Sequence, residues 1–257
     1  MNIGRLPQIL ITNDDGISAK GIAALIEAAK PFGELFVLAP DKPQSGMGHA
    51  ITIHDPIRMF KSELYPGVQA YACSGTPVDC VKLGISELLG KKPDLLLSGI
   101  NHGENSSTNV LYSGTMSAAI EGAMEGIPSF GFSLADFSAD ADFSAAQHYI
   151  TILLQHFFEK GFAPSICLNV NIPKLPLSAI NGIRVCKQAH AYWADRFEKR
   201  QDQYGRDYFW LTGEFADLDQ RPDTDLHALK EGYVSVVPTH FDLTAYAHLE
   251  HLKSWEQ

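Results

Sequence analysis

Five apolar runs alternate with helical patterns in the first 134 residues, and this alternation limits the possible folds more than any other feature. The runs resemble strands that are covered on both faces, and they lie at 8–12, 34–40, 68–74, 93–101 and 127–134. Segments with helical spacing separate them, at 18–33, 76–90 and 113–126. Ser18 is in position to cap the first helix. Because this order is typical of βαβ units, we predict an α/β protein with a parallel sheet covered on both faces.

The pattern changes in the last quarter of the chain, where aromatic and charged residues alternate around a turn-like QYGRD segment at 203–207. This is typical of a β-hairpin that is too polar for the centre of a sheet. An apolar strand at 233–244 and an amphipathic helix at 245–257 follow. Protruding arms of this kind often exchange between protomers, so a homo-oligomer is expected. We expect one domain, 1–257, formed by an α/β core and then by an arm of hairpin, returning strand and C-terminal helix, at 1–189 and 190–257.

The composition excludes several classes of protein. The 257 residues include 30 acidic and 20 basic ones, which gives a formal net charge of −10. That balance argues against a nucleic-acid polymer as a partner, since such binding needs a cationic surface. No run approaches about 18 consecutive apolar residues, so we expect no interaction with a membrane through a spanning segment.

The start of the chain and its cysteines indicate a compartment. The first residues contain no long apolar region followed by a small-residue cleavage pattern, so we expect no secretory signal. The cysteines form no C-x-x-C pair and lie far apart, at Cys73, Cys80, Cys167 and Cys186. Scattered cysteines in a chain of this size are typical of free thiols in a reducing compartment. We therefore expect a cytoplasmic protein.

Three polar loops follow predicted strands and carry the first candidate site. They are NDDG, DKPQSGMGH and SGINHGENSS, at 13–16, 41–49 and 98–107. In a parallel sheet, ligands bind outside the carboxyl ends of the strands. Because all three loops follow such ends, we expect them to meet at one edge of the sheet.

These loops offer a set of oxygen atoms. Asp14 and Asp15 supply carboxylates, Ser45 supplies a hydroxyl and Asn101 supplies an amide oxygen. Such a set suits Mg²⁺, Mn²⁺ or Ca²⁺ better than Zn²⁺, which prefers His or Cys ligands. The same residues are also common in turns, because Asn and Asp side chains bind nearby backbone amides. The sequence alone leaves the turn and the metal site open.

A second candidate site lies at the start of the predicted helix at 113–126. Ser113, Gly114 and Thr115 would present small side chains and free backbone amides, which suits a phosphate group. Ser113 could also serve as a simple N-cap. The segment CSGTP at 73–77 contains the same triplet before a helix, so one of the two copies is expected to be only a cap.

Other motifs predict little. GMGHAI at 46–51 lacks the third glycine of a dinucleotide-binding fingerprint, and neither a P-loop nor a G-x-S-x-G motif is present. His49 and His102 could be general acids or simply hydrogen-bonding loop residues. The acidic stretch near the hairpin lacks the Gly and Glu of an EF-hand, so we expect a solvated loop at Asp217, Asp219, Asp223 and Asp225.

Five stretches, in order along the chain, resemble the SurE family of stationary-phase survival proteins, which are metal-dependent nucleotidases. The stretches are ILITNDDGISAKGI, APDKPQSGMGHAIT, SGTPVDCVKLGI, PDLLLSGINHGEN and VLYSGTMSAAIEGAMEGIPSFGFSL. A weaker match lies at 223–244. The resemblance implies a Rossmann-like, three-layer parallel sheet core with a swapped C-terminal hairpin and helix arm, and a homodimer or homotetramer.

The resemblance also implies a reaction and its residues. It indicates a cytoplasmic phosphatase that hydrolyses nucleoside monophosphates, at the 5′ and also the 3′ position, with one Mg²⁺ or Mn²⁺ ion. The implied metal ligands are Asp14, Asp15, Ser45 and Asn101, of which the two aspartates are catalytic. The implied phosphate-binding residues are Ser113, Gly114 and Thr115, to which we add the neighbouring Asn13 and Gly46.

One segment departs from the family pattern. Many members have Asn-Leu-Gly-x-Asp-Val before the tyrosine, whereas this chain has Ser107 and Asn109 in place of the glycine and the aspartate. The departure concerns base preference, because the metal set is intact. The nucleophile is left open between water and an aspartate that forms a covalent phosphoenzyme. Two alternative functions also stay open: a phosphatase for another small phosphate ester or short polyphosphate, and a non-catalytic metal-dependent nucleotide-binding protein.

Overall fold

A computed structural model describes residues 5–256 of the chain. Residues 1–4 and Gln257 lie outside the described residues. Residues 1–4 begin the segment that is expected to contain no secretory signal. The core is a sheet of nine strands in the order β3-β4-β2-β1-β5-β6-β7-β11-β8. The strands are β1 Gln8–Thr12, β2 Glu34–Pro40, β3 Met59–Ser62, β4 Gln69–Cys73, β5 Leu95–His102, β6 Ser129–Leu134, β7 Cys167–Ile172, β8 Ile183–Val185 and β11 Val234–Thr239.

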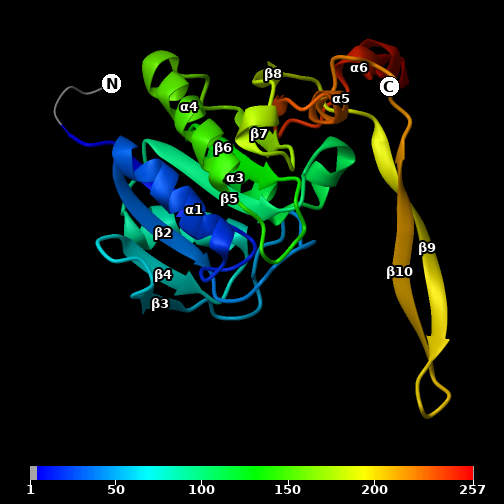
Figure 1. Cartoon of the computed structure of the whole chain (residues 1–257). Helices are drawn as coiled ribbons and strands as arrows, with labels where there is room; N and C mark the ends of the chain where they lie inside the picture. Colours follow the sequence, from blue (N-terminus) through cyan, green and yellow to red (C-terminus); the bar gives the residue numbers. More distant parts are fainter. Residues whose placement is uncertain (1–4, 257) are drawn as a thin grey trace.

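The central strands, from β4 to β7, are all parallel, whereas β3 and β11 each run antiparallel to a neighbour. Helices cover both faces of the sheet (Figure 1); they are α1 Lys20–Ala29, α2 Pro77–Leu83, α3 Gly114–Met124, α4 Ser144–Lys160 and α5 Asp225–Lys230, whereas α6 Tyr246–Leu252 lies near the C-terminus and buries none of its residues. Helices α1 and α4 pack against each other, and so do α2 and α3. The α/β fold class with a mainly parallel sheet is therefore confirmed.

Strand β1 shows why the apolar runs form central strands. Alternate side chains of a strand point to opposite faces, and here Ile9 and Ile11 join the core cluster under α1 and α4, whereas Leu10 joins the cluster under α2. All three are completely buried. A central strand of a parallel sheet needs apolar residues on both faces, so its sequence is a continuous apolar run.

The structure differs from the sequence predictions at two elements and one cap. The edge strand β3 and the short helix α5 were not predicted, since both are short and half polar. The prediction that Ser18 caps the first helix is wrong, because α1 begins at Lys20 and its N-cap is Ala19, which makes no side-chain hydrogen bond.

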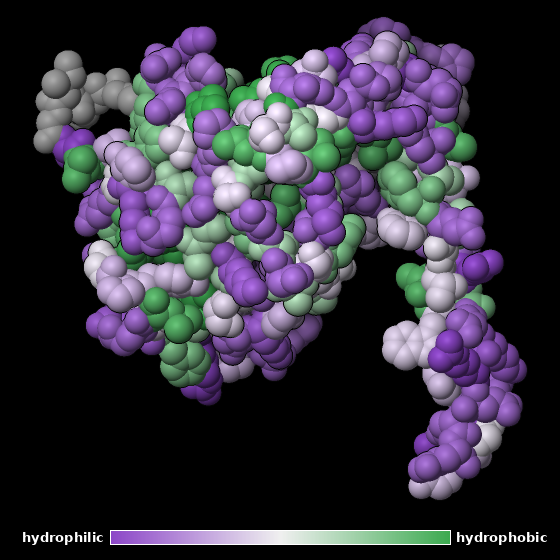
Figure 2. All heavy atoms as spheres, in the orientation of Figure 1, coloured by the Kyte–Doolittle hydropathy of each residue, from purple (hydrophilic) through white to green (hydrophobic). Residues whose placement is uncertain are grey.

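The polar hairpin predicted near the C-terminus is present. Strands β9 (Ala191–Gln201) and β10 (Asp207–Asp217) pair in antiparallel register from Ala191 opposite Asp217 to Gln201 opposite Asp207. The hairpin projects away from the core (Figure 1), and Figure 2 shows that its outer half is mostly hydrophilic. After it, β11 returns to the core sheet between β7 and β8. The division at residue 190 and the exchange of the arm between protomers stay predictions.

None of the helices in the described part of the chain combines the length and the apolar character needed to cross a bilayer.

The packing of α1 on the sheet predicts an unusual effect at Gly21. A Cβ added there would lie 1.9 Å from the backbone oxygen of Ile100. In an open helix, Gly→Ala stabilises by about 1 kcal/mol. We expect Gly21→Ala instead to lower the free energy of unfolding by about 2 kcal/mol, because the helix must move away from β5. Urea denaturation measures this change. A stabilised Gly21→Ala variant would contradict the prediction, and Ala23→Gly in the same helix is the control for propensity alone.

Candidate active site

The segment NDDG does form a turn at the carboxyl end of β1. The Asn13 side-chain amide donates a hydrogen bond to the Gly16 carbonyl (3.0 Å). Gly16 has a φ of +94°, a conformation that favours glycine. The turn directs the chain from the sheet into α1. Asn13 therefore has a clear structural role, although its Oδ1 is buried without a hydrogen-bond partner.

Asp14 is buried where β1 meets the start of α3. Its side chain is packed against Gly114, where a Cβ would lie 2.7 Å from the Cβ of Asp14. The Thr115 hydroxyl donates a hydrogen bond to Asp14 Oδ1. Burial raises the pKa of Asp14 to about 6, partly opposed by that hydrogen bond. Gly114 and Thr115 thus allow a helix N-terminus to approach a buried carboxylate closely.

The loop after β2 is tied to the same place. The Gln44 amide donates a hydrogen bond to the Asp14 carbonyl (2.7 Å), and the Gly48 amide donates one to the Tyr112 carbonyl (3.2 Å). These bonds hold Ser45 and Gly46 between the end of β1 and the segment that precedes α3. Gly46 has a φ of +77° and nothing near the position of a Cβ.

The end of β5 brings in Asn101 and Asp15. The pairing of β5 with β6 shifts register between Ser98 and Asn101, and such a bulge changes the direction of the side chains that follow. The Asn101 amide donates to the Gly103 carbonyl (2.8 Å), and the His102 backbone amide donates to Asp15 Oδ2 (3.2 Å). Burial raises the pKa of Asp15. The ends of β1 and β5 are therefore joined through a carboxylate.

A cavity of about 770 Å³ lies at this edge of the sheet. Its volume is in the range of small-molecule sites. Five of the predicted site residues line it: Asp14, Ser45, Gly46, Asn101 and Ser113. The other four, which are outside its lining, are Asn13, Asp15, Gly114 and Thr115. Three loops that are far apart in sequence thus converge on one cavity, as expected for the carboxyl edge of a parallel sheet.

The two SGT triplets do different things. Ser113 caps α3, since its hydroxyl accepts a hydrogen bond from the Met116 amide (3.0 Å). The start of α3 faces the cavity, and the first amides of a helix have no partner within it. In the other copy, Thr76 and Asp79 form a capping box. That copy is a helix cap, whereas Ser113 combines capping with a place at the cavity.

The oxygen atoms at this edge fit a divalent cation. Two carboxylates lie close together, and one buried amide oxygen, Asn13 Oδ1, has no partner. Among the residues that the structure describes, no group of three or more His, Cys, Asp or Glu side chains could hold a metal. A cation here would therefore depend on the hydroxyl and amide oxygens as well as on the two aspartates, which is a donor set suited to Mg²⁺ or Mn²⁺.

Sequence reasoning missed several cavity residues. Glu104 and Asn105 line it from the loop after β5, and Tyr192 and Trp193 line it from the arm. The expectation of a solvated acidic loop is wrong for Asp225, which is completely buried and accepts hydrogen bonds from three backbone amides. The side chain of Asp219 is also only 5% exposed, in its ion pair with Arg221. No local pattern distinguishes these two aspartates from the exposed Asp217 and Asp223.

Of the two histidines, His102 lines the cavity and His49 does not. His49 Nε2 instead lies 2.9 Å from Glu121 Oε2, and the Lys82 ammonium group also donates a hydrogen bond to Glu121. The Glu121 side chain is buried. This contact ties the loop that carries Ser45 to α3. Burial alone would raise the pKa of Glu121, but the hydrogen bonds from His49 and Lys82 outweigh it and lower this pKa.

A lowered pKa means that ionised Glu121 stabilises the fold above the pKa of an unfolded glutamate, and that this contribution disappears as the pH falls through the folded pKa. We expect Glu121→Gln to lower the free energy of unfolding by about 2 kcal/mol at pH 7. The difference from the wild type should shrink below about pH 4. Urea unfolding at both pH values measures it. Glu125→Gln, whose partner Lys92 is at the surface, is the control, and a difference independent of pH would contradict the explanation.

Comparisons with known proteins identify the family of this chain. The family model described as survival protein SurE matches residues 9–195. Two proteins named 5'-nucleotidase SurE, from Christiangramia forsetii and Cytophaga hutchinsonii, are each 54% identical over 252 residues. These matches cover 97% of this chain and 96% and 97% of the two relatives.

A solved structure gives the same result at the level of the fold. The crystal structure of the SurE protein from Aquifex aeolicus matches with a TM-score of 0.85 and 39% identity, over 98% of this chain and 100% of that chain. The resemblance that the sequence motifs indicated is thus confirmed over nearly the whole length. This chain belongs to the SurE family.

Proposed function

We propose that this protein is a divalent-metal-dependent phosphatase that hydrolyses nucleoside monophosphates to nucleoside and phosphate, at the 5′ position and also at the 3′ position. The names of its relatives support the 5′-nucleotidase activity. The observation that carries the proposal is the buried carboxylate of Asp14 beside the N-terminus of α3 in one cavity. Such a site offers an anion-binding helix end and a cation-binding carboxylate at the same point.

The residues of the chain have distinct roles in this proposal. Asp14 and Asp15, with Ser45 and Asn101, would hold the cation, which supplies charge neutralisation at phosphorus when bound. The amides at the start of α3 would bind phosphate oxygens, and Thr115 would hold the Asp14 carboxylate in place through its hydroxyl. Asn13 and Gly46 would also contact the phosphate group. Water attacks phosphorus in line with the leaving oxygen, and a covalent aspartyl-phosphate is the alternative that rapid-quench trapping would reveal.

The charge of the cavity favours a single phosphate over a chain of them. Among the described residues that line it, none is Lys or Arg, whereas Glu104 and Asp195 are acidic. A polyphosphate would bring further negative charges toward these carboxylates, where no cation of the protein neutralises them. The lining away from α3 offers amides and aromatic side chains, which suit a nucleoside. Nucleoside monophosphates therefore fit the cavity better than short polyphosphates do.

The decisive test measures phosphate release from 5′- and 3′-nucleoside monophosphates with Mg²⁺, with Mn²⁺ and with EDTA. We expect release with a metal and none with EDTA. Asp14→Asn and Asp15→Ala should each lower kcat by about a thousandfold or more while remaining folded, as circular dichroism would show. Near-normal activity in either variant would contradict its role. Nucleotide binding without phosphate release would favour a non-catalytic binding protein.

We also propose that the protein acts as a homodimer or homotetramer in the cytoplasm. The four cysteines are free and buried, which supports a reducing compartment. Large apolar side chains are exposed on the two hairpin strands, on α6 and just before α6, namely Phe197, Phe209, Trp210, Leu243, Leu249 and Leu252. Such a surface is expected where a second copy binds.

The oligomeric state can be measured by light scattering coupled to size-exclusion chromatography. We expect the mass of a dimer or tetramer. Replacing Phe209 and Trp210 together by Ser should reduce it, because the exposed apolar surface of β10 is then lost. A wild-type protein that elutes with the mass of one chain would contradict the proposal.

A further inference from the structure

The base of the arm forms one wall of the cavity. Residues of both hairpin strands line it: Tyr192, Trp193 and Asp195 from β9, and Leu211, Thr212 and Gly213 from β10. The cavity also includes Thr108, Asn109 and Leu111 of the 3₁₀ helix η3 (Ser107–Leu111). The part of the cavity away from the α3 N-terminus is therefore built by the arm and by η3, and the arm contributes to a site in its own chain.

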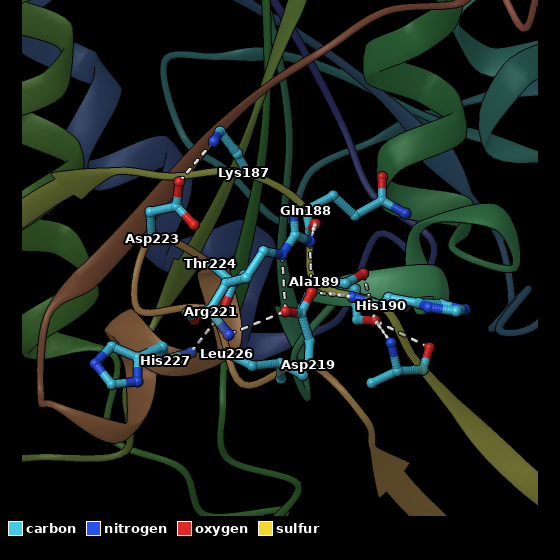
Figure 3. Close-up of polar contacts among 12 residues, drawn as sticks. Lys187, Gln188, Ala189, His190, Asp219, Arg221, Asp223, Thr224, Leu226 and His227 are labelled. Carbon is cyan, nitrogen blue, oxygen red and sulfur yellow. Dashed lines mark hydrogen bonds and ion pairs between the residues drawn. The ribbon is translucent and has the colours of Figure 1, made fainter. Parts of the chain in front are cut away.

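Polar contacts clamp the arm where it leaves and re-enters the core. Figure 3 shows the two chain segments side by side, with Lys187 and Asp223 at one end of the contact and His190 and Asp219 at the other. Lys187 Nζ lies 2.7 Å from Asp223 Oδ2, and the His190 amide donates to Asp219 Oδ2 (2.8 Å). The Arg221 guanidinium binds Asp219 from within the returning segment. These polar contacts hold the base of the hairpin against the returning segment.

A buried carboxylate joins this clamp to η3. The Asp225 side chain accepts hydrogen bonds from the amides of Ser107 (2.8 Å) and Ala189 (2.9 Å). The Ser107 hydroxyl in turn accepts one from the Ala191 amide (2.9 Å). Ser107 has a φ of 55°, an uncommon conformation for a residue with a side chain. These bonds fix the first residues of β9 against η3, and so fix the positions of Tyr192 and Trp193.

Trp193 presents a ring suited to stacking. It is 49% exposed although it lines a cavity, and its ring packs edge-on against Phe215 of the opposite strand, with 5.7 Å between the ring centroids. Asp195 and Gly213, which also line the cavity, lie on the same face of the hairpin as Trp193, whereas the side chain of Tyr192 points to the opposite face. A large aromatic side chain held half-exposed at a cavity offers a face to a flat ligand. A nucleobase is such a ligand, and stacking on aromatic side chains accepts any base.

We propose that the base of the arm is the nucleoside wall of the site, with the nucleobase stacking on Trp193, and with Ser107 and Asp225 positioning this wall. The inference rests on the proposed nucleotidase function. It makes Trp193 a specificity-determining residue, since it separates nucleotides from phosphate esters that lack a base. Ser107 is a positioning residue, because it acts through the chain segment that carries Tyr192 and Trp193.

The test compares adenosine 5′-monophosphate with ribose 5-phosphate, which has the same ester but no base. We expect Trp193→Ala to lower kcat/KM for the nucleotide by about tenfold, and for ribose 5-phosphate by no more than about twofold. Trp193→Phe keeps an aromatic face and should retain most of the preference for the nucleotide. An equal loss with both substrates, or no loss with the nucleotide, would overturn the inference.

Two controls separate this result from general damage. Phe60→Ala removes an exposed aromatic side chain from the edge strand β3, outside the arm and the cavity lining, and should change kcat/KM for neither substrate. Ser107→Ala keeps the backbone conformation and removes only the hydroxyl. It should lower kcat/KM for the nucleotide more than for ribose 5-phosphate, whereas an equal loss would contradict its positioning role.

Adenosine itself distinguishes failure of the wall from failure of the proposed reaction. If the wild type releases phosphate from no substrate, the proposed function is wrong, and calorimetric titration with adenosine still tests the wall. Weaker binding of adenosine to Trp193→Ala than to the wild type would support the inference. Equal binding to the two proteins would overturn it.

Discussion

The site depends on the parallel pairing of β1 with a strand on each side. The register of β1 with β2 and with β5 places the carboxyl ends of the three strands at one edge. The residues that follow these strands must then meet, although Asp15 and His102, for example, are 87 positions apart. Gln44 binds the Asp14 carbonyl, and the His102 amide binds the Asp15 carboxylate. These bonds lock the edge that the sheet has brought together.

The buried negative charge of Asp14 is unfavourable at this edge, and it determines what the site can bind. Asp14 lies in a cavity lining without lysine or arginine among its described residues, and burial raises its pKa. A phosphate group that approached it directly would be repelled. The amides at the start of α3 compensate part of this charge, and a divalent cation would compensate the rest. Because no lysine or arginine in the lining neutralises the carboxylate, the proposed site needs a metal ion to do so.

The arm combines two surfaces with different properties. Its base is held to the returning segment by contacts of Asp219 and Asp223 (Figure 3) and by the buried Asp225. Residues of this base line the cavity. The outer part of the arm extends from the core (Figure 1). Phe197 and Trp210 are exposed on it. Oligomerisation through the outer part would therefore restrain the same hairpin that forms the wall. This geometry links the proposed assembly of the protein to the shape of the proposed nucleoside wall.

The sequence by itself determined the alternation of the main strands and helices along the first 134 residues, and it identified residues such as Asp14, Ser45 and Asn101 as neighbours. It did so because apolar runs and strand ends are local features that parallel pairing translates directly into space. The tertiary structure alone decided that Asp225 is buried and that Trp193 faces the cavity. Asp225 binds the Ser107 amide across 118 residues. A contact between such distant segments leaves no periodicity or motif, because its geometry is fixed only when the core has packed.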